Sequence, residues 1–226
     1  MARTLWSVIL LLVSFHASAQ EVFLQRGDVY LKNERDEMVQ MTASGLDSEA
    51  VLSPDGKFIA FVRDTPGVLV TAGVGDINAT ELWLLNVSTR KAELLVRGKS
   101  GPEMEKTIAG IASPRFSLDG RTIYFLSFAW VTSGSIQMVS VKTKKLRFIT
   151  DGVALDVIYK AGEYRGFLLI DRALIKSDSN GNSLGRDVYL WLYSPDGKPV
   201  REIGQTDGEA AEKFRAEVAI IPVRAE

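Results

Sequence analysis

The sequence Gly181-Asn-Ser-Leu-Gly185 has the spacing of a nucleophile elbow, the strand-to-helix turn that exposes a catalytic serine. The motif requires a helix after the serine and a histidine nearby as general base. Here a polar turn leads into a strand-like run at Val188–Tyr193, and the only histidine of the chain is His16. We therefore predict that this serine is not a catalytic nucleophile.

Asp178, Asn180 and Asn182, in the same segment, alternate like the oxygen ligands that begin a calcium-binding loop. The sixth position of that pattern is Ser183 instead of glycine, and the twelfth is Tyr189 instead of a bidentate glutamate. A flexible Asn/Gly turn is the simpler interpretation, and calcium binding stays open as an alternative. The sequence predicts no metal site and no cofactor.

Three further aspartates, Asp55, Asp119 and Asp196, are carboxylates of the kind that glycoside hydrolases use in pairs. Each of them precedes a glycine in a short polar segment. Aspartate is favoured at such positions because its side chain hydrogen-bonds to the local backbone. We therefore predict a structural role in hairpin turns and no catalytic residue.

The first 19 residues have the organisation of a secretory signal peptide. A positive charge at Arg3 precedes an apolar run from Leu5 to Phe15, and the segment ends in Ala17-Ser-Ala19. We expect cleavage after Ala19, which leaves residues 20–226 as one exported domain, periplasmic or secreted. The apolar run is short for a membrane span, so a retained anchor is the lesser alternative.

Cleavage would also remove His16, and the chain has no cysteine. Histidine-based acid–base catalysis, thiolate nucleophiles and His/Cys metal sites are therefore not expected in the exported chain. With 27 basic and 28 acidic residues, the net charge of −1 provides no overall excess with which to hold a nucleic acid. The apolar fraction of 46% is that of a globular protein.

Four segments repeat one pattern, a strand-like run, a polar turn and a second strand-like run. The first runs begin at Val29, Leu82, Ile136 and Val188, at intervals of 52 to 54 residues. β-Branched and aromatic residues flank turns such as Ser194-Pro-Asp-Gly197, in which proline presets φ and glycine accepts the left-handed position. Each segment is predicted to form an antiparallel hairpin.

A second unit lies between the hairpins. Leu52-Ser-Pro-Asp-Gly-Lys-Phe-Ile-Ala-Phe-Val62 is repeated at Phe116–Leu126, with a degraded copy at Tyr159–Ile170. Its strands, Phe58–Val62 and Ile123–Leu126, are apolar on both faces, which favours strands between two neighbouring sheets. The sequence thus predicts an all-β, propeller-like array of about four four-stranded antiparallel blades, of which the first is incomplete.

The Ser-Pro-Asp-Gly-Lys-x-Ile-Ala-Phe unit, followed by an Asp/Glu-aliphatic-aromatic-Leu strand, resembles the propeller repeat of TolB-type periplasmic proteins. A similar repeat occurs in the non-catalytic propeller of prolyl oligopeptidase and dipeptidyl peptidase enzymes. The likeness covers roughly residues 28–204. It implies a propeller fold in a bacterial protein. TolB-like proteins have a further N-terminal α/β domain and six blades, so contacts with the Tol–Pal system are not carried over to residues of this chain.

The run Glu217–Val223 is the only strand-like segment after the last hairpin. We predict that it pairs beside Val29–Met41 and closes the array, after a short helix at Glu209–Ala216. An oligomer that covers the open edge is the alternative.

Strand alternation places the Asp-Gly and hairpin turns at one end and the inserted segments Asp64–Thr80, Arg97–Ala112 and Arg172–Arg186 at the other. Apolar residues without an evident core gather at that second end. They are the predicted partner-binding residues: Val68, Leu69, Val70, Phe128, Trp130, Leu174 and Ile175. An exposed apolar patch favours a protein partner, and the alternative is that these residues pack on one another as a lid.

The predicted function is an exported, non-catalytic propeller that serves as a protein-interaction module of the bacterial cell envelope. One alternative is an accessory or relic propeller of a secreted peptidase or polysaccharide-processing enzyme. Another is a binder of a small ligand or metal in the central channel. Neither a nucleic-acid partner nor a membrane span after cleavage is expected.

Overall fold

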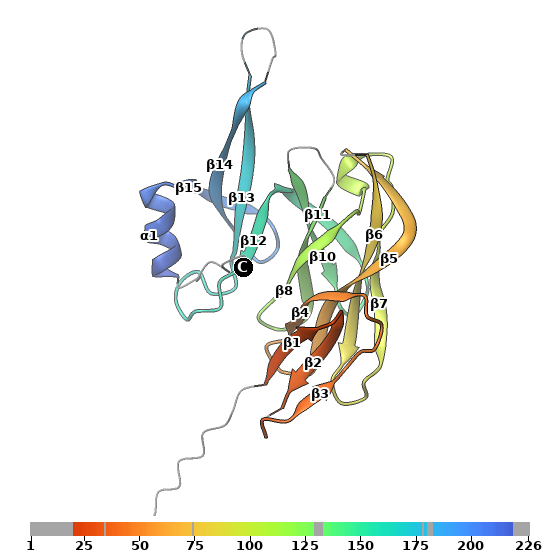
Figure 1. Ribbon diagram of the computed structural model, residues 1–226. Coiled ribbons are helices and arrows are strands. Elements are labelled where there is room, and N and C mark those ends of the chain that lie inside the picture. The colour runs from red at the N-terminus through yellow and green to blue at the C-terminus, as the bar shows by residue number, and fades with distance from the viewer. Residues whose placement is uncertain are drawn as a thin grey trace, which may run out of the picture.

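The computed structural model describes residues 20–218, apart from 34, 74, 129–132, 178 and 180–182. In this part of the chain, four antiparallel sheets follow one another along the sequence and stack side by side (Figure 1). In every sheet the strands are hydrogen-bonded in sequence order. The predicted all-β array of antiparallel blades is confirmed.

The first sheet has three strands in the described residues: β1 (Glu21–Gln25), β2 (Asp28–Lys32) and β3 (Met38–Gln40). The second sheet comprises β4 (Asp47–Leu52), β5 (Phe58–Ala72), β6 (Gly75–Asn86) and β7 (Ala92–Arg97). The third comprises β8 (Ile111–Phe116), β9 (Thr122–Ser127), β10 (Gly134–Ser140) and β11 (Leu146–Gly152). The fourth comprises β12 (Ala154–Val157), β13 (Leu168–Ser177), β14 (Ser183–Tyr193) and β15 (Pro199–Gln205). A 3-10 turn, η1 (Met104–Lys106), precedes the third sheet, and helix α1 (Glu209–Glu217) follows the fourth.

The doubly apolar strand β5 shows why the sheets stack. Ile59 and Phe61 point into a cluster with the first sheet, whereas Ala60 and Val62 point into a cluster with the third. All four side chains are buried. A strand with core on both faces must lie between two sheets, as its sequence pattern predicts.

Equivalent contacts continue along the stack. Tyr124, Leu126 and Ile136 of the third sheet form a cluster with Leu168 and Ile170 of the fourth. Near one end of the blades, the Tyr124 hydroxyl donates to the Pro195 carbonyl at 2.7 Å. The neighbouring Tyr159 hydroxyl donates in the opposite direction, to the Phe116 carbonyl at 2.6 Å. Burial raises the pKa of both tyrosines to about 12, so both hydroxyls remain protonated donors at physiological pH.

Strand β1 was not among the predicted elements. It pairs with β2 through a tight turn in which Arg26 and Gly27 have φ values of 54° and 74°. Two consecutive positive φ angles define a type I′ hairpin turn. A Cβ on Gly27 would lie 2.3 Å from the Gly45 carbonyl oxygen, so glycine is required there. The first blade was predicted to be incomplete, and strand β1, which precedes β2 in the chain, supplies part of what it lacks.

The prediction that Glu217–Val223 forms a closing strand is wrong for the first residues of that segment. Glu217 is the last residue of α1, and Val218 is its C-cap; residues 219–223 lie outside the described residues. Ala211 and Phe214 of α1, with Val218, pack against Leu190 and Leu192 of the fourth sheet. The helix therefore covers the face on which a further blade would stack (Figure 1). Between Gln20 and Val218, the described residues contain no helix with the length and apolar character of a membrane span.

Candidate functional site

The described blades have two distinct ends, which we call the loop end and the turn end. The loop end, at the top of Figure 1, carries η1 and the ends of strands β5, β6, β13 and β14 that lie farthest from the Asp-Gly turns. The turn end carries the short connections that include the Asp-Gly turns. Figure 1 thus confirms that the inserted segments gather at one end.

The insertion Asp64–Thr80 is an extension of strands β5 and β6 instead of a loop. Its register shifts between Thr65 and Leu69, where proline and glycine interrupt the ladder. Proline has no N–H to donate, and Gly67 adopts a positive φ of 81°, so the backbone bulges there. Val68 and Leu69 are exposed at this bulge, Leu69 to 60%.

Val70 does not belong to the exposed patch. Its side chain is only 2% exposed and packs with Ala72, Ala79 and Ala109. Side chains alternate between the faces of a strand, so Val70 points onto the 98–110 connection while Leu69 points away from it. The prediction that Val70 has no core to join is therefore wrong, since it packs in a small cluster of alanines.

The β13–β14 hairpin projects from the fourth sheet as an arm (Figure 1). Its pairing with β12 ends at Asp171, and its pairing with β15 ends at Gln205, opposite Tyr189. Beyond these points the arm is a two-stranded ribbon without a described strand on either edge. Such edges present backbone donors and acceptors to solvent.

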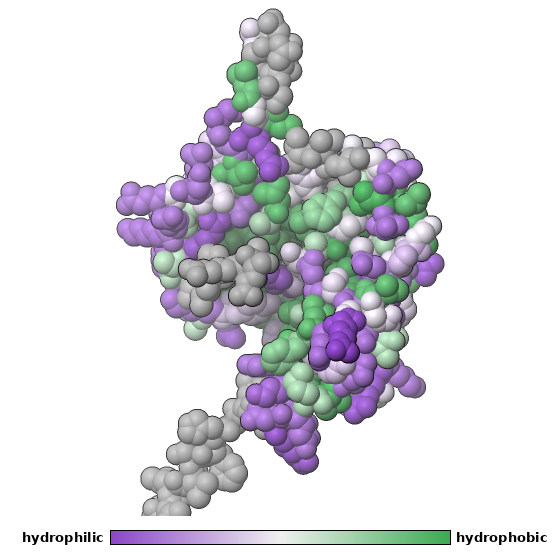
Figure 2. Space-filling view, viewed as in Figure 1, coloured by the Kyte–Doolittle hydropathy of each residue, from purple (hydrophilic) through white to green (hydrophobic). Residues whose placement is uncertain are grey.

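Apolar side chains are exposed on this arm. Leu174 and Ile175 follow one another in β13 and therefore point to opposite faces; Ile175 is 57% exposed. Leu184 of β14, which the sequence prediction missed, is 66% exposed. Figure 2 shows hydrophobic side chains on the described part of the arm and at the right-hand edge of the same end. Leu184 is the one apolar residue in the sequence Gly181–Asp187, so no alternation of apolar and polar residues pointed to it.

A groove of about 500 Å³ separates the base of the arm from the third sheet. It is lined by Glu105, Ser133, Phe148, Asp151, Ala173, Leu174 and Ile175. The groove is thus bordered by the stretch of β13 that contains Leu174 and Ile175, by Phe148, and by two acidic residues. This arrangement suits an apolar segment of another polypeptide.

Arg172 fixes the base of the arm next to this groove. Its guanidinium donates to Asp151 at 2.6 Å and lies 5.5 Å from the centre of the Trp191 ring. Burial acts to lower the pKa of Arg172, but the hydrogen bond and charge of Asp151 outweigh it, so the pKa lies above its ordinary value. Arg172 is therefore a permanent cation that ties the fourth sheet to the third.

Phe128, at the exit of β9, is 47% exposed and lies against Gly110, which has no side chain to obstruct it. Trp130 lies outside the described residues. The exposed members of the predicted patch are thus Val68, Leu69, Phe128, Leu174 and Ile175.

The aspartates of the Asp-Gly turns have the predicted structural role. Asp55 accepts from the Ser53 hydroxyl at 2.7 Å and from the Lys57 backbone N–H at 3.2 Å. Asp119 repeats the pattern, accepting from Ser117 at 2.7 Å and from the backbone N–H two residues onward at 3.0 Å. The Ser194 hydroxyl likewise donates to Asp196. These hydrogen bonds hold the pKa of all three carboxyls below their ordinary value, to about 2 for Asp196.

The Asp119→Ala variant tests this turn chemistry. We expect it to lose about 1 kcal/mol of unfolding free energy at pH 7, because two hydrogen bonds to an exposed carboxylate are removed. The folded-state pKa is depressed, so this stability is present above the unfolded pKa and is lost as the pH falls through the folded pKa. In urea titrations, the difference in unfolding free energy between the variant and the unchanged protein should be smaller at pH 3 than at pH 7. Glu163→Ala, an exposed acid of the same end, should have no such effect.

The candidate nucleophile and the candidate calcium ligands of the β13–β14 segment are not shown to form a site. Ser183 and Gly185 belong to strand β14, so no helix follows the serine and the elbow is excluded. Asp178, Asn180 and Asn182 lie outside the described residues. Across the described ranges, no group of three or more His, Cys, Asp or Glu side chains is placed to hold a metal ion.

The inner strands of the three complete sheets are joined by side chains. The backbone N–H of Ser113 donates to the Glu49 carboxylate, linking β8 to β4. Arg115 donates to Asp156 at 3.1 Å, linking β8 to β12. Burial raises the pKa of Asp156, and Arg115 opposes this shift. These polar groups therefore hydrogen-bond to one another between the inner strands β4, β8 and β12.

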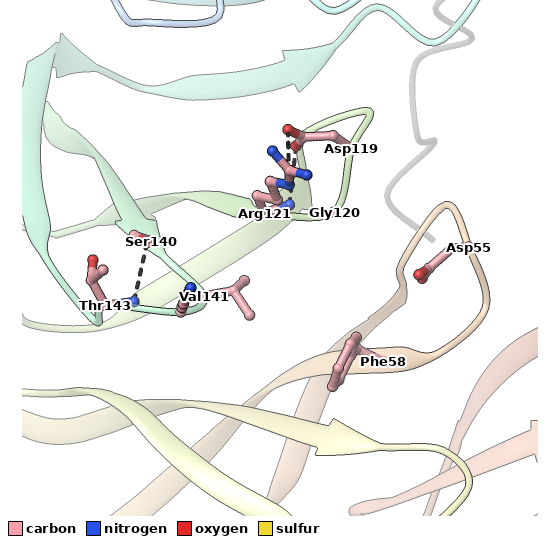
Figure 3. A pocket seen from close by; sticks show the side chains of 9 residues that line it. Asp55, Phe58, Asp119, Gly120, Arg121, Ser140, Val141 and Thr143 are labelled. Atoms are coloured by element: carbon pink, nitrogen blue, oxygen red, sulfur yellow. Dashed lines mark hydrogen bonds and ion pairs between the residues drawn. The ribbon is translucent and has the colours of Figure 1, made fainter.

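The turn end contains a second groove, of about 600 Å³, between the second and third sheets. Figure 3 shows it between the Asp55 turn, the Asp119–Arg121 turn and the β10–β11 turn. Phe58 and Val141 form its apolar part, and Asp55 and Asp119 lie at its rim. The sequence prediction assigned no function to this end.

Solved structures with the same fold include the propeller domain of the Trilobed protease from Pyrococcus furiosus, with 12% identity and a TM-score of 0.50 over 78% of this chain and 48% of that one. Porphyromonas gingivalis dipeptidyl peptidase 4 has 14% identity and a TM-score of 0.50 over 81% of this chain and 31% of that one. TolB from Acinetobacter baumannii has 16% identity and a TM-score of 0.49, over 77% and 37%. No family model and no curated protein matches the sequence.

The architecture defines a β-propeller-type protein, as the resemblance of its repeats implied. The chain spans between about a third and half of the length of these solved proteins. At this level of identity the likeness concerns the fold, and the function has to be argued from the surfaces described above.

Proposed function

We propose that the protein is an exported, non-catalytic propeller that binds a protein partner of the cell envelope through its loop end. The observation that carries the proposal is the fourth-sheet arm. It presents Leu174, Ile175 and Leu184 to solvent beside a groove with an apolar wall. Exposed apolar residues next to a rigid, polar-rimmed groove are typical of protein interfaces.

The form of the arm favours a polypeptide over a small ligand. Both of its edges lack a described strand partner, so a partner segment can add to the ribbon by backbone hydrogen bonding. The groove beside it would accept alternate side chains of that segment. Leu69, on the β5–β6 hairpin, is a further exposed apolar residue at the same end.

Site-specific photo-crosslinking tests the proposal. A photoreactive residue placed at Ile175 or Leu69 should crosslink in cells to one partner protein, and one placed at Lys142 of the turn end should not. Ile175→Asp should abolish crosslinking from position 69, because a charge at the centre of an apolar interface is costly to desolvate. Its thermal unfolding should remain nearly unchanged, since the side chain is already exposed. Equal crosslinking from both ends would contradict the proposal.

The second candidate is an accessory propeller of a secreted peptidase. It is favoured by the fold, which this chain shares with propeller domains of peptidases. In that case the partner crosslinked from position 175 would be a hydrolase that contains its own nucleophile and histidine.

A further inference from the structure

The charges of the chain are unevenly distributed. The turn end of the second, third and fourth sheets comprises residues 53–57, 87–93, 117–121, 141–147, 158–167 and 194–198, which are the connections at this end together with the first two residues of β7 and of β11. They contain eleven basic side chains: Lys57, Arg90, Lys91, Arg121, Lys142, Lys144, Lys145, Arg147, Lys160, Arg165 and Lys198. They contain five acidic ones: Asp55, Glu93, Asp119, Glu163 and Asp196. All sixteen are exposed, so the turn end of these three sheets has an excess of six positive charges (11 − 5) in a chain whose net charge is only −1.

Contacts between sheets make this end one continuous surface. Lys144 of the third sheet forms an ion pair of 3.0 Å with Glu93 of the second. Arg147 of the third sheet donates to the carbonyl of Asp196 in the fourth. The groove of Figure 3 joins the Asp55 turn to Arg121 and Lys142. The basic side chains therefore belong to one surface that extends over three blades.

Local ion pairs involve four of the five acids and leave several basic side chains without an acidic partner. Asp55, Asp119 and Asp196 pair with the basic residue two positions onward, and Glu93 pairs with Lys144. No ion pair with another described residue is formed by Arg90, Lys91, Lys142, Lys145 or Arg165. These five cations are available to an external anion.

We propose that the turn end docks onto an anionic lipid surface. Neighbouring sheets stack about 10 Å apart, so the bases of three blades extend over about 20–30 Å. A planar array of phosphodiester headgroups meets all of them at once, whereas a small anion meets only one or two. Asp55 and Asp119 stand at the rim of the groove, which opposes entry of a single phosphate. The proposal is independent of the partner site at the loop end.

Vesicle co-sedimentation tests the proposal with the chain from Gln20 onward, because the apolar run in residues 1–19 would itself bind lipid. The protein should sediment with phosphatidylcholine vesicles that contain about one third phosphatidylglycerol, and not with phosphatidylcholine alone. Rising salt should release it. Lys142→Glu combined with Lys145→Glu should weaken partitioning at least about 25-fold, since each of the two basic groups removed contributes a factor of about five near an anionic surface.

The matched control is Lys99→Glu combined with Lys106→Glu, which makes the same charge change at the loop end. This variant should partition like the unchanged protein. Equal loss in both variants, or no sedimentation with the anionic vesicles, would overturn the proposal. Tighter binding to soluble dextran sulfate than to vesicles of equal charge concentration would also overturn it, in favour of an acidic polymer. Ile175→Asp should retain vesicle binding, and the Lys142/Lys145 variant should retain crosslinking from position 175, so each proposal can fail separately.

Discussion

Phe214→Asp should abolish stable folding of the fourth sheet. Phe214 is 5% exposed, and its ring contacts Tyr164 at 5.5 Å between ring centres. Loss of a buried phenylalanine costs about 3–5 kcal/mol, and an unpaired buried carboxylate adds to this. The total is comparable with the whole stability of a domain, about 5–15 kcal/mol. Urea unfolding followed by tryptophan fluorescence should show no native transition, or one shifted by at least about 5 kcal/mol.

Two variants of the same helix keep this expectation testable. Phe214→Leu retains most of the apolar contact and should lose less than about 1.5 kcal/mol. Lys213→Asp changes an exposed neighbour and should have almost no effect. If Phe214→Asp unfolds like Lys213→Asp, α1 does not serve as the cover of the fourth sheet.

Phe116→Ala should lower the free energy of unfolding by about 3–5 kcal/mol. Phe116 is fully buried in the cluster that joins the second and third sheets. Its carbonyl also accepts the Tyr159 hydroxyl of the fourth sheet. Truncation leaves a cavity between two sheets that cannot collapse without moving both, so we expect a cost in the upper part of this range.

The matched control is Phe23→Ala in the first sheet, where the ring is 40% exposed. It should lose less than about 1 kcal/mol, because solvent already reaches much of the side chain. The two transitions are compared in the same urea titration. Similar losses would mean that the junction between the second and third sheets contributes no more than a surface contact.

The sequence predicted the repeated architecture because its signals are local. Alternation, turn chemistry and strands with two apolar faces are set by residues adjacent in the chain. The 52–54-residue spacing of Val29, Leu82, Ile136 and Val188 therefore identified β2, β6, β10 and β14 correctly. The same reasoning gave Asp55, Asp119 and Asp196 their turn roles, since each bonds groups within a few residues.

Strand β1 and the arms show where local signals become ambiguous. β1 is short and mostly exposed, so it has no buried face to produce a pattern. The inserted segments carry polar, proline and glycine residues that are typical of loops, yet they continue the ladders of β5–β6 and β13–β14. The two strands are already paired within the blade, so their cross-strand hydrogen bonding can continue along the inserted segments.

Only the tertiary structure decided which apolar residues are exposed and where the charges gather. Val70 is buried because the 98–110 connection folds back onto its face of the strand, whereas Leu69, its neighbour, faces solvent. The predicted strand at Glu217 is the end of a helix because Phe214 and Val218 find an uncovered apolar sheet to pack on. The basic end is assembled from turns up to about 140 residues apart in a sequence that is almost neutral overall. Burial and surface charge depend on which segments lie side by side in space. This is determined by the stacking of the sheets and not by residues adjacent in the chain.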